Sequence, residues 1–321
     1  MLQYKDIDLI VIVGAQKSGT SSLFSYLSEH YQVAESITKQ SCYFMSEGYY
    51  ALNKSDVPRQ YSKKLEDFLS LFPSVQPHTK ALVEATPDYL HTPGVLVRIK
   101  AMECYFRSVQ VVAVLRHPVD RFVSWYRFSI QLNKIDSHTS LKDYYDMNGH
   151  ILTAFKESDG CFFAKESGQY EQFLPQALDL FGDNLHVLSF DQLKNSPREL
   201  LTSLCNHIGL DSNYYNQYEF GVVNKTVSIR SPALAKTYLG LRRVYIFIMN
   251  SPLRKAAKPI RNIISTAYHR INDTAYAPIN GAHQEASYNE LYEYYKKTIL
   301  FCNKHYNFKW KQKHNGSEKN D

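Results

Sequence analysis

This 321-residue sequence lacks long apolar runs, paired cysteines and the histidine spacings of common metal sites. Its first apolar run is only as long as a strand and follows no basic region, so we expect neither a membrane span nor a signal peptide. The five cysteines are odd in number and form no C-x-x-C pair, which indicates reduced thiols in a cytoplasmic protein. No H-x-x-x-H or H-E-x-x-H spacing occurs among the twelve histidines, and we therefore predict no metal site.

Acidic residues are missing from one long segment, 231–270, which contains eight Lys or Arg. The segment carries +8 and the whole chain only +6, so the rest of the chain is slightly acidic. Basicity confined to one segment argues against a general nucleic-acid coat and for a single anionic contact surface. A solvated helical face, a groove for an anionic glycan and a peripheral membrane contact are the alternatives for this basic helical segment.

Length and composition fit one α/β domain. Apolar residues make up 44% of the chain and charged residues 21%, which is enough to bury a sizeable core. No internal repeat or convincing linker divides the chain, so we predict a single domain over residues 1–310 that includes the basic segment. The polar residues 311–321 are predicted to form a disordered tail.

The stretch from Ile10 to Leu23 combines a strand, a turn and the start of a helix. Val, Ile and Leu follow one another without alternation, as in a central strand of a parallel sheet that is covered on both faces. Gly14 and Gly19 allow backbone N–H groups to turn inward, and Lys17 adds a positive charge before the helix N-terminus, where the helix dipole favours anions. This loop predicts a phosphate site, although a capped turn with a solvated lysine has the same pattern.

An ATP site of the Walker A type is disfavoured by the position of the lysine. That motif, G-x-x-x-x-G-K-[ST], has its lysine after the second glycine, where this chain has Thr20. Lys17 instead precedes Gly19 by two residues, and the dinucleotide pattern G-x-G-x-x-G is absent. A P-loop-like nucleotide kinase or NTP-binding module remains the alternative function.

A second strand also delivers positive charge to its carboxyl end. Val109–Leu115 is apolar except for Gln110 and is followed by Arg116, and Pro118 suits the first position of the following helix. Arg116 and Ser124 could clamp an anionic group through charge-assisted hydrogen bonds. Because no acidic metal ligand ends this strand, the two strand ends together predict a nucleotide with separated anionic groups and no obligatory magnesium.

Apolar periodicity predicts the elements around these two loops. A polar linker follows His30, strands are expected within 81–90 and at 185–190, and helices are expected at 59–72, 93–106, 170–181, 200–208 and 284–303. The predicted buried face of the helix over 170–181 comprises Tyr170, Phe173, Leu174, Ala177, Leu178 and Phe181. The pattern favours an α/β fold with a P-loop-like central parallel sheet, flanked by helices and interrupted by helical insertions.

Over roughly residues 8 to 235 the chain resembles the sulfotransferases that use 3′-phosphoadenosine 5′-phosphosulfate (PAPS). Gln16–Leu23 resembles the family's 5′-phosphosulfate loop, and Arg116–Ser124 is similar to its 3′-phosphate motif, R-x-P-x-x-R-x-x-S. Thr38–Phe44 resembles T-K-E-x-x-F-F, and Glu84–Leu90 resembles the E-x-T-P-x-Y turn. These further matches are most similar to bacterial and heparan-sulfate-type members.

The resemblance implies that PAPS is the co-substrate, that 3′-phosphoadenosine 5′-phosphate (PAP) is the product, and that no metal is needed. Lys17 would stabilise charge on the departing nucleotide during in-line transfer. Residues 224–231 are similar to the stretch that closes over the nucleotide. The nucleotide-binding residues that the resemblance implies are Gln16, Lys17, Ser18, Gly19, Thr20, Ser21 and Ser22 at the 5′ side, Arg116 and Ser124 at the 3′-phosphate, and Arg230.

The general base and the acceptor stay open at this point. The family usually carries a glutamate after the lysine of T-K-E-x-x-F-F, but this chain has Gln40, which cannot accept a proton at neutral pH. Glu84 is the first candidate replacement, followed by Glu35 and Glu47; otherwise the acceptor needs little deprotonation, or the protein is a nucleotide-binding scaffold without catalysis. The acceptor would be a hydroxyl or nitrogen of a glycan or of a small-molecule natural product.

Overall fold

The computed structural model describes residues 4–45, 64–132, 134–148, 160–221 and 282–311, together with 228–229, Thr237 and 273–274. Several sequence-based predictions fall elsewhere in the chain. Arg230, Glu47 and residues 312–321 lie outside the described residues, and so does the basic segment 231–270 except for Thr237.

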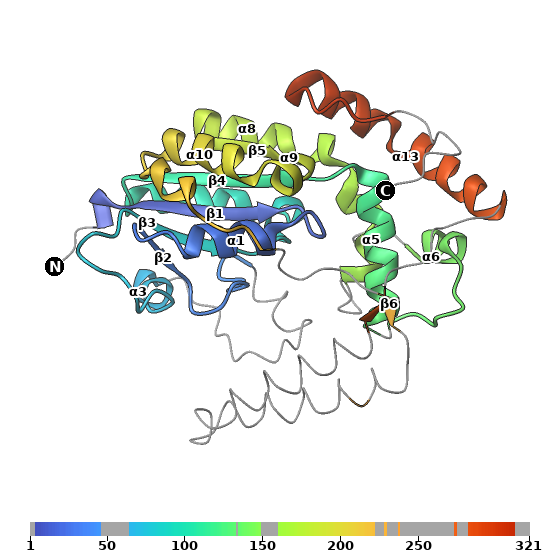
Figure 1. Cartoon of the computed structure of the whole chain (residues 1–321), viewed down its shortest axis with the longest axis horizontal. Coiled ribbons are helices and arrows are strands. Elements are labelled where there is room, and N and C mark those ends of the chain that lie inside the picture. The colour runs from blue at the N-terminus through green and yellow to red at the C-terminus, as the bar shows by residue number, and fades with distance from the viewer. Residues whose placement is uncertain are drawn as a thin grey trace.

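A five-stranded parallel sheet forms the centre of the fold (Figure 1). Its strands, in the order in which they lie side by side, are β2 (Val33–Glu35), β3 (Ala81–Ala85), β1 (Asp8–Gly14), β4 (Ser108–Leu115) and β5 (Leu185–Ser189). Every residue of β1 is buried, as a run without alternation predicts for a strand with both faces covered. The predicted α/β fold with a central parallel sheet flanked by helices is confirmed.

Alternate residues of β1 enter two separate cores. Leu9, Val11 and Val13 belong to one core, whereas Ile10 and Ile12 belong to the other. Because successive side chains of a strand point to opposite faces, these two cores are the two faces of the sheet. The helices are divided accordingly, with α4 (Val95–Lys100) and α8 (Leu174–Phe181) in the first core and α1 (Thr20–Ser28) and α10 (Pro197–Ile208) in the second.

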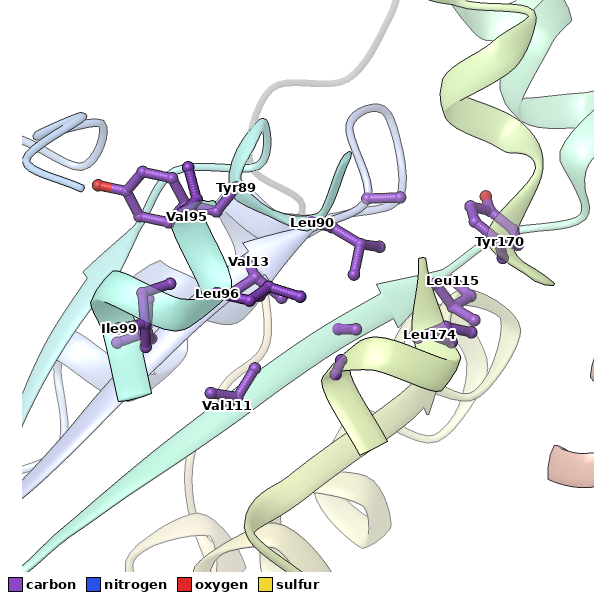
Figure 2. Close-up of a cluster of buried hydrophobic side chains, with 14 of the residues drawn as sticks. Val13, Tyr89, Leu90, Val95, Leu96, Ile99, Val111, Leu115, Tyr170 and Leu174 are labelled. Atoms are coloured by element: carbon purple, nitrogen blue, oxygen red, sulfur yellow. The ribbon is translucent and has the colours of Figure 1, made fainter. Parts of the chain in front are cut away.

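Figure 2 shows the first of these cores. Val13 of β1 and Val111 of β4 lie in one layer with Leu96 of α4 and Leu174 of α8, and none of the four side chains is more than 3% exposed. Burying one Val or Leu side chain contributes roughly 1.5–3 kcal/mol. This layer therefore holds the strands and helices at fixed positions relative to one another.

Further described elements surround the sheet. Helix α13 packs against α5 and α6, and the Tyr295 hydroxyl on α13 donates to the carbonyl of Lys165 at 2.7 Å (Figure 1). The remaining described helices are α3 (Leu65–Leu69), α5 (Pro118–Gln131), α6 (Leu141–Met147), α9 (Phe190–Asn195) and α13 (Ala282–Tyr306). Strand β6 (Ser228–Ile229) pairs antiparallel with β7 (Asp273–Thr274). The 3-10 turns lie at Tyr4–Asp6, Tyr89–His91, Ala101–Cys104, Gly160–Phe163, Glu166–Gly168, Tyr170–Gln172, Gly182–Asn184 and Ser212–Asn216.

The helix predicted over 170–181 begins later than its apolar pattern indicates. A 3-10 turn occupies Tyr170–Gln172, and α8 starts at Leu174 with Pro175 in its first turn. Proline has no N–H to donate and its ring clashes with the carbonyl four residues earlier, so an α-helix that started at 170 could not pass through it. Leu178 is 52% exposed, and the prediction that it belongs to the buried face is wrong.

Two other elements differ from the prediction. The helix expected over 93–106 ends as α4 at Lys100 and continues as a 3-10 turn, Ala101–Cys104. Strand β2 lies within the predicted polar linker, because three residues are too few for a periodic signal and only its pairing with β3 makes it a strand. Of the helix predicted over 59–72, the described part from residue 64 onward is helical at Leu65–Leu69.

The buried and exposed sides of α8 can be tested by two leucine substitutions. We expect Leu174→Ala to lower the free energy of unfolding by about 2–5 kcal/mol, because Leu174 is 0% exposed and its removal leaves a cavity. Leu178→Ala on the exposed side should change it by less than about 0.5 kcal/mol. Urea unfolding with unchanged m-values measures both effects. Equal losses of unfolding free energy for the two variants would contradict the exposed position of Leu178.

Candidate active site

Three loops meet at one edge of the sheet. Strands β1, β3 and β4 are parallel neighbours and end at Gly14, Ala85 and Leu115, so the segments that follow them emerge side by side. The loop after β1 is bonded directly to β4, because the Ala15 N–H donates to the carbonyl of Val114 at 2.8 Å. Ligands of open α/β sheets bind at such a carboxyl edge.

The loop after β1 turns sharply into α1 at Gly19. This residue has φ +86° and forms the N-cap of the helix, so a left-handed conformation is required there. A Cβ at this position would lie only 3.1 Å from side-chain atoms of Phe190 and Leu193, which leaves no room for another residue. The turn places the hydroxyl residues Ser18, Thr20, Ser21 and Ser22 within the first turn of α1 or just before it. Helix N–H groups that lack partners make this turn a site for an anion.

Lys17 lies in this loop, and its amine packs against an aromatic ring. Its Nζ is 3.6 Å from the centroid of the Phe128 ring on α5. Burial, together with the nearby positive charges of Arg116 and Lys39, lowers the pKa of Lys17 to about 7. A bound anion would oppose this shift, since it favours the protonated amine. The predicted role of Lys17 therefore has a matching electrostatic environment.

The predicted 3′-phosphate residues share the same part of the structure. Ser124 is 7% exposed and lies one helical turn before Phe128, so it is on the face of α5 that covers Lys17. The Arg116 guanidinium lies 4.7 Å from the Phe190 ring, and burial lowers its pKa. No carboxylate in the described part of the chain forms an ion pair with it, although Asp120 and Asp191 attract it electrostatically. The structure thus brings Lys17, Arg116 and Ser124 to one site.

Lys39 is a member of this site that the sequence reasoning did not assign. Its Nζ donates to the Ser21 hydroxyl at 2.7 Å and to the Thr20 hydroxyl at 3.3 Å. Burial lowers the pKa of Lys39 to about 8, while the carboxylates of Glu84 and Asp88 act in the opposite direction. A second amine therefore contacts the predicted phosphosulfate loop. The signal that could have found it was its place in Thr38–Phe44, one residue before Gln40.

Asp88 is the second residue that the sequence reasoning missed. It follows β3 in the E-x-T-P-x-Y turn, and its Oδ1 accepts a hydrogen bond from Nε2 of Gln16, the residue before Lys17. Burial raises the pKa of Asp88 to about 6, and the charge of Lys39 opposes this shift. Gln16 therefore connects the loop after β1 to the loop after β3.

Glu84, the first candidate for the general base, lies on β3 and is 0% exposed. Its Oε1 accepts from the backbone N–H and the hydroxyl of Ser41 and from the hydroxyls of Thr86 and Tyr89. Burial raises its pKa to about 7, and these hydrogen bonds act against the increase. The contacts tie the segment after Gln40 to β3. Its role as a base stays a prediction.

The other candidate residues, Gln40 and Glu35, do not share the burial of Glu84. Gln40 is exposed, as is Glu35 at the end of the edge strand β2. Among the described residues, no group of three or more His, Cys, Asp or Glu side chains is arranged to hold a metal ion.

A family model described as "Sulfotransferase family" matches residues 9–214, which is well over half of the chain. The chain belongs to the sulfotransferase family. The match contains both predicted anion motifs, from Gln16 to Ser124, and the three loops at the sheet edge.

Two curated sulfotransferases and one solved structure are similar to this chain. The membrane-associated sulfotransferase kil1 of Dictyostelium discoideum is 35% identical over 121 residues, which cover 38% of this chain and 23% of the relative. A bifunctional heparan sulfate N-deacetylase/N-sulfotransferase 1 of Caenorhabditis briggsae is 24% identical over 215 residues, which cover 64% of this chain and 23% of the relative. The chain thus spans about a quarter of the length of these relatives.

The crystal structure of a sulfotransferase from Alicyclobacillus acidocaldarius has the same fold. It superposes with a TM-score of 0.53 at 20% identity and covers 74% of this chain and 93% of that one. In the described portion of this chain, no helix has both the length and the apolar character that crossing a membrane requires.

The lowered pKa values of Lys17 and Lys39 can be measured directly. After reductive ¹³C-methylation, the NMR signals of Lys17 and Lys39 should titrate near pH 7 and 8, because burial disfavours their charged forms. Lys17→Arg and Lys39→Arg assign the two signals by removing them. Midpoints near the ordinary lysine value of about 10.4 for both residues would contradict the buried site described above.

Proposed function

We propose that this protein transfers the sulfuryl group of PAPS to a hydroxyl or nitrogen of a glycan or small-molecule acceptor. The observation that carries the proposal is that two separate cationic positions, Lys17 and Arg116 with Ser124, lie at one sheet edge beside a helix N-terminus. PAPS has anionic groups at both its 5′ and 3′ positions, so a nucleotide of this kind supplies an anion for each of the two cationic positions. PAP would be the product.

The loop residues would act mainly by positioning and by stabilising charge. Gln16 and Ser18 through Ser22 would hold the 5′-phosphosulfate at the start of α1, where backbone N–H groups and the helix dipole favour an anion. Lys17 would donate to the bridging oxygen, on which negative charge develops as the bond to sulfur breaks. Arg116 and Ser124 would hold the 3′-phosphate, and this distant contact would fix the direction of in-line attack.

Desolvated cations support an anionic ligand over a purely structural role. Lys17 and Lys39 have lowered pKa values and Arg116 has no ion-pair partner among the described residues, so the ligand-free site holds excess positive charge. Such crowding costs free energy that an anion would offset. Arg230, outside the described residues, is proposed as a further contact on the basis of the family resemblance.

A nucleotide kinase or NTP-binding module is the weaker alternative. Thr20 stands where a Walker A lysine would be, and β4 ends in Arg116 rather than in an acidic magnesium ligand. Family membership favours sulfuryl transfer. A cytoplasmic location and a peripheral membrane contact through residues 231–270 also remain proposals.

The acceptor class is best addressed by screening. One relative is named for heparan sulfate N-sulfation, which supports glycans and amines as acceptors to test first. Incubation of the protein with ³⁵S-labelled PAPS and panels of glycans, phenols and amines would reveal which class takes up label.

Nucleotide binding provides the first test of the proposed function. Calorimetry should show binding of PAP, weakened at least tenfold by Lys17→Ala and by Arg116→Ala, since each loses a charge-assisted hydrogen bond worth about 1.5–3 kcal/mol. Lys142→Ala is the control, because this lysine pairs with Asp146 and Glu290 at the surface. Absence of PAP binding, or tighter binding of magnesium ATP, would overturn the proposal.

The pH dependence of PAP binding tests the role of Lys17. Binding favours the protonated amine, so PAP affinity should fall as pH rises above the free pKa of about 7, by up to tenfold per unit. The range from about pH 7.5 to 9 avoids ionisation of the phosphates. Lys17→Arg keeps its charge throughout this range and should show a shallower decline. An equal slope in both proteins would exclude Lys17 as the titrating group.

A further inference from the structure

The reaction needs a group that can take a proton from the acceptor, and Gln40 cannot supply it. The structure offers two carboxylates close to the phosphosulfate loop, Glu84 and Asp88, which are four residues apart. We propose that Asp88 is the general base that accepts the proton of the attacking hydroxyl or amine. This inference rests on the proposed function, because it assigns a role within PAPS-dependent transfer.

The position of Asp88 is set by a hydrogen bond to the loop after β1. Gln16 Nε2 donates to Oδ1 of the carboxylate. A carboxylate has about four acceptor positions, so this donor leaves room for the proton of an acceptor. Since Gln16 directly precedes Lys17, the base is anchored to the loop that would hold the sulfuryl donor.

Exposure separates the two carboxylates. The side chain of Asp88 is 17% exposed, so one side of it meets solvent at the edge of the sheet. Glu84 is 0% exposed, and its Oε1 already receives hydrogen bonds from Ser41, Thr86 and Tyr89. Its second oxygen, Oε2, is sealed from solvent and has no partner among the described residues. An acceptor molecule can approach Asp88 and cannot approach Glu84 without breaking this network.

The charged groups around Asp88 suit a base at neutral pH. Burial raises its pKa to about 6 and Lys39 opposes the rise, so most of the carboxylate is ionised at pH 7 and can still accept a proton. His91 Nε2 lies 3.8 Å from Oδ1, but burial lowers its pKa to about 3 and the charge of Arg121 adds to the effect. His91 is therefore neutral. Glu84, like Asp88, lies near enough to Lys39 for its charge to raise the pKa of that lysine.

The step balances as a single transfer. An acceptor lone pair forms a bond to sulfur while the bond between sulfur and the bridging oxygen of PAPS breaks. The electron pair of that bond stays on the 5′-phosphate of PAP, where Lys17 stabilises it. The acceptor proton moves to a carboxylate oxygen of Asp88 and is then released to solvent.

The decisive variant is Asp88→Asn, whose side-chain oxygen can still accept the hydrogen bond from Gln16. PAP release from PAPS is measured from pH 5 to 8 with water as the only acceptor and at saturating PAPS, because the bound anion keeps Lys17 protonated over this range; PAP binding is measured by calorimetry. We expect the variant to bind PAP as the parent does but to turn over PAPS at least 100-fold more slowly, in line with the usual contribution of a general base. The parent rate should rise through about pH 6 and then level off, and the variant should lack this rise. Asp179→Asn on the exposed side of α8 is the control.

Chemical rescue separates a base from a structural support. Sodium formate should restore part of the activity of Asp88→Ala, because formate can occupy the space and accept the proton, while sodium chloride at equal concentration should not. Asp88→Asn should show no rescue.

The outcomes distinguish the inference from the proposed function. No PAP binding by the parent protein would overturn both, and so would PAP binding with neither PAPS breakdown nor transfer of label to any acceptor of the panel. If the parent binds PAP and turns over PAPS, the inference alone fails when Asp88→Asn keeps its activity within threefold, keeps the rise near pH 6, or loses PAP binding. That last result would make Asp88 a support for the loop.

Discussion

The pairing of β1 with β3 on one side and β4 on the other is the constraint on which the site depends. Because all three strands run parallel, the loops that follow them must emerge at the same edge, and those loops carry Lys17, Asp88 and Arg116. The hydrogen bond from Ala15 to Val114 extends this pairing one residue beyond β1. A slip of one residue in β1 would exchange its two buried faces and move Lys17 away from Phe128.

Crowded positive charge is the main energetic feature of the site. Burial lowers the pKa values of Lys17 and Lys39 and disfavours their charged forms, and the positive charges of Arg116 and Lys39 add to the effect on Lys17. The free energy gained by burying the apolar cores on both faces of the sheet offsets this cost. An anionic nucleotide would relieve it, so the same charges that disfavour the ligand-free site favour the complex. The Phe128 ring contributes by excluding water on one side of Lys17 while leaving its amine over a polarisable face.

Two carboxylates in one short segment have different environments. Glu84 points into the interior from β3 and fastens the segment after Gln40 through Ser41, whereas Asp88 lies in the turn beyond the strand and faces the loop through Gln16. The strand residue is sealed because β3 is covered on both faces. The turn residue stays partly exposed because the sheet ends there. This difference in exposure leaves Glu84 with structural contacts alone and gives Asp88 access to an acceptor.

The sequence by itself determined the parallel-sheet fold, the phosphate-type loop at Lys17 and the second cationic strand end at Arg116. These features are local: an apolar run predicts a buried strand, and a lysine between two glycines after that strand predicts an anion-binding turn. Tertiary structure alone decided which further residues join the site, because Lys39 and Asp88 reach Ser21 and Gln16 across separations of 18 and 72 residues. It also decided that Glu84 is enclosed. The burial of a strand depends on the helices that cover it, and the residue pattern of β3 alone does not predict those helices.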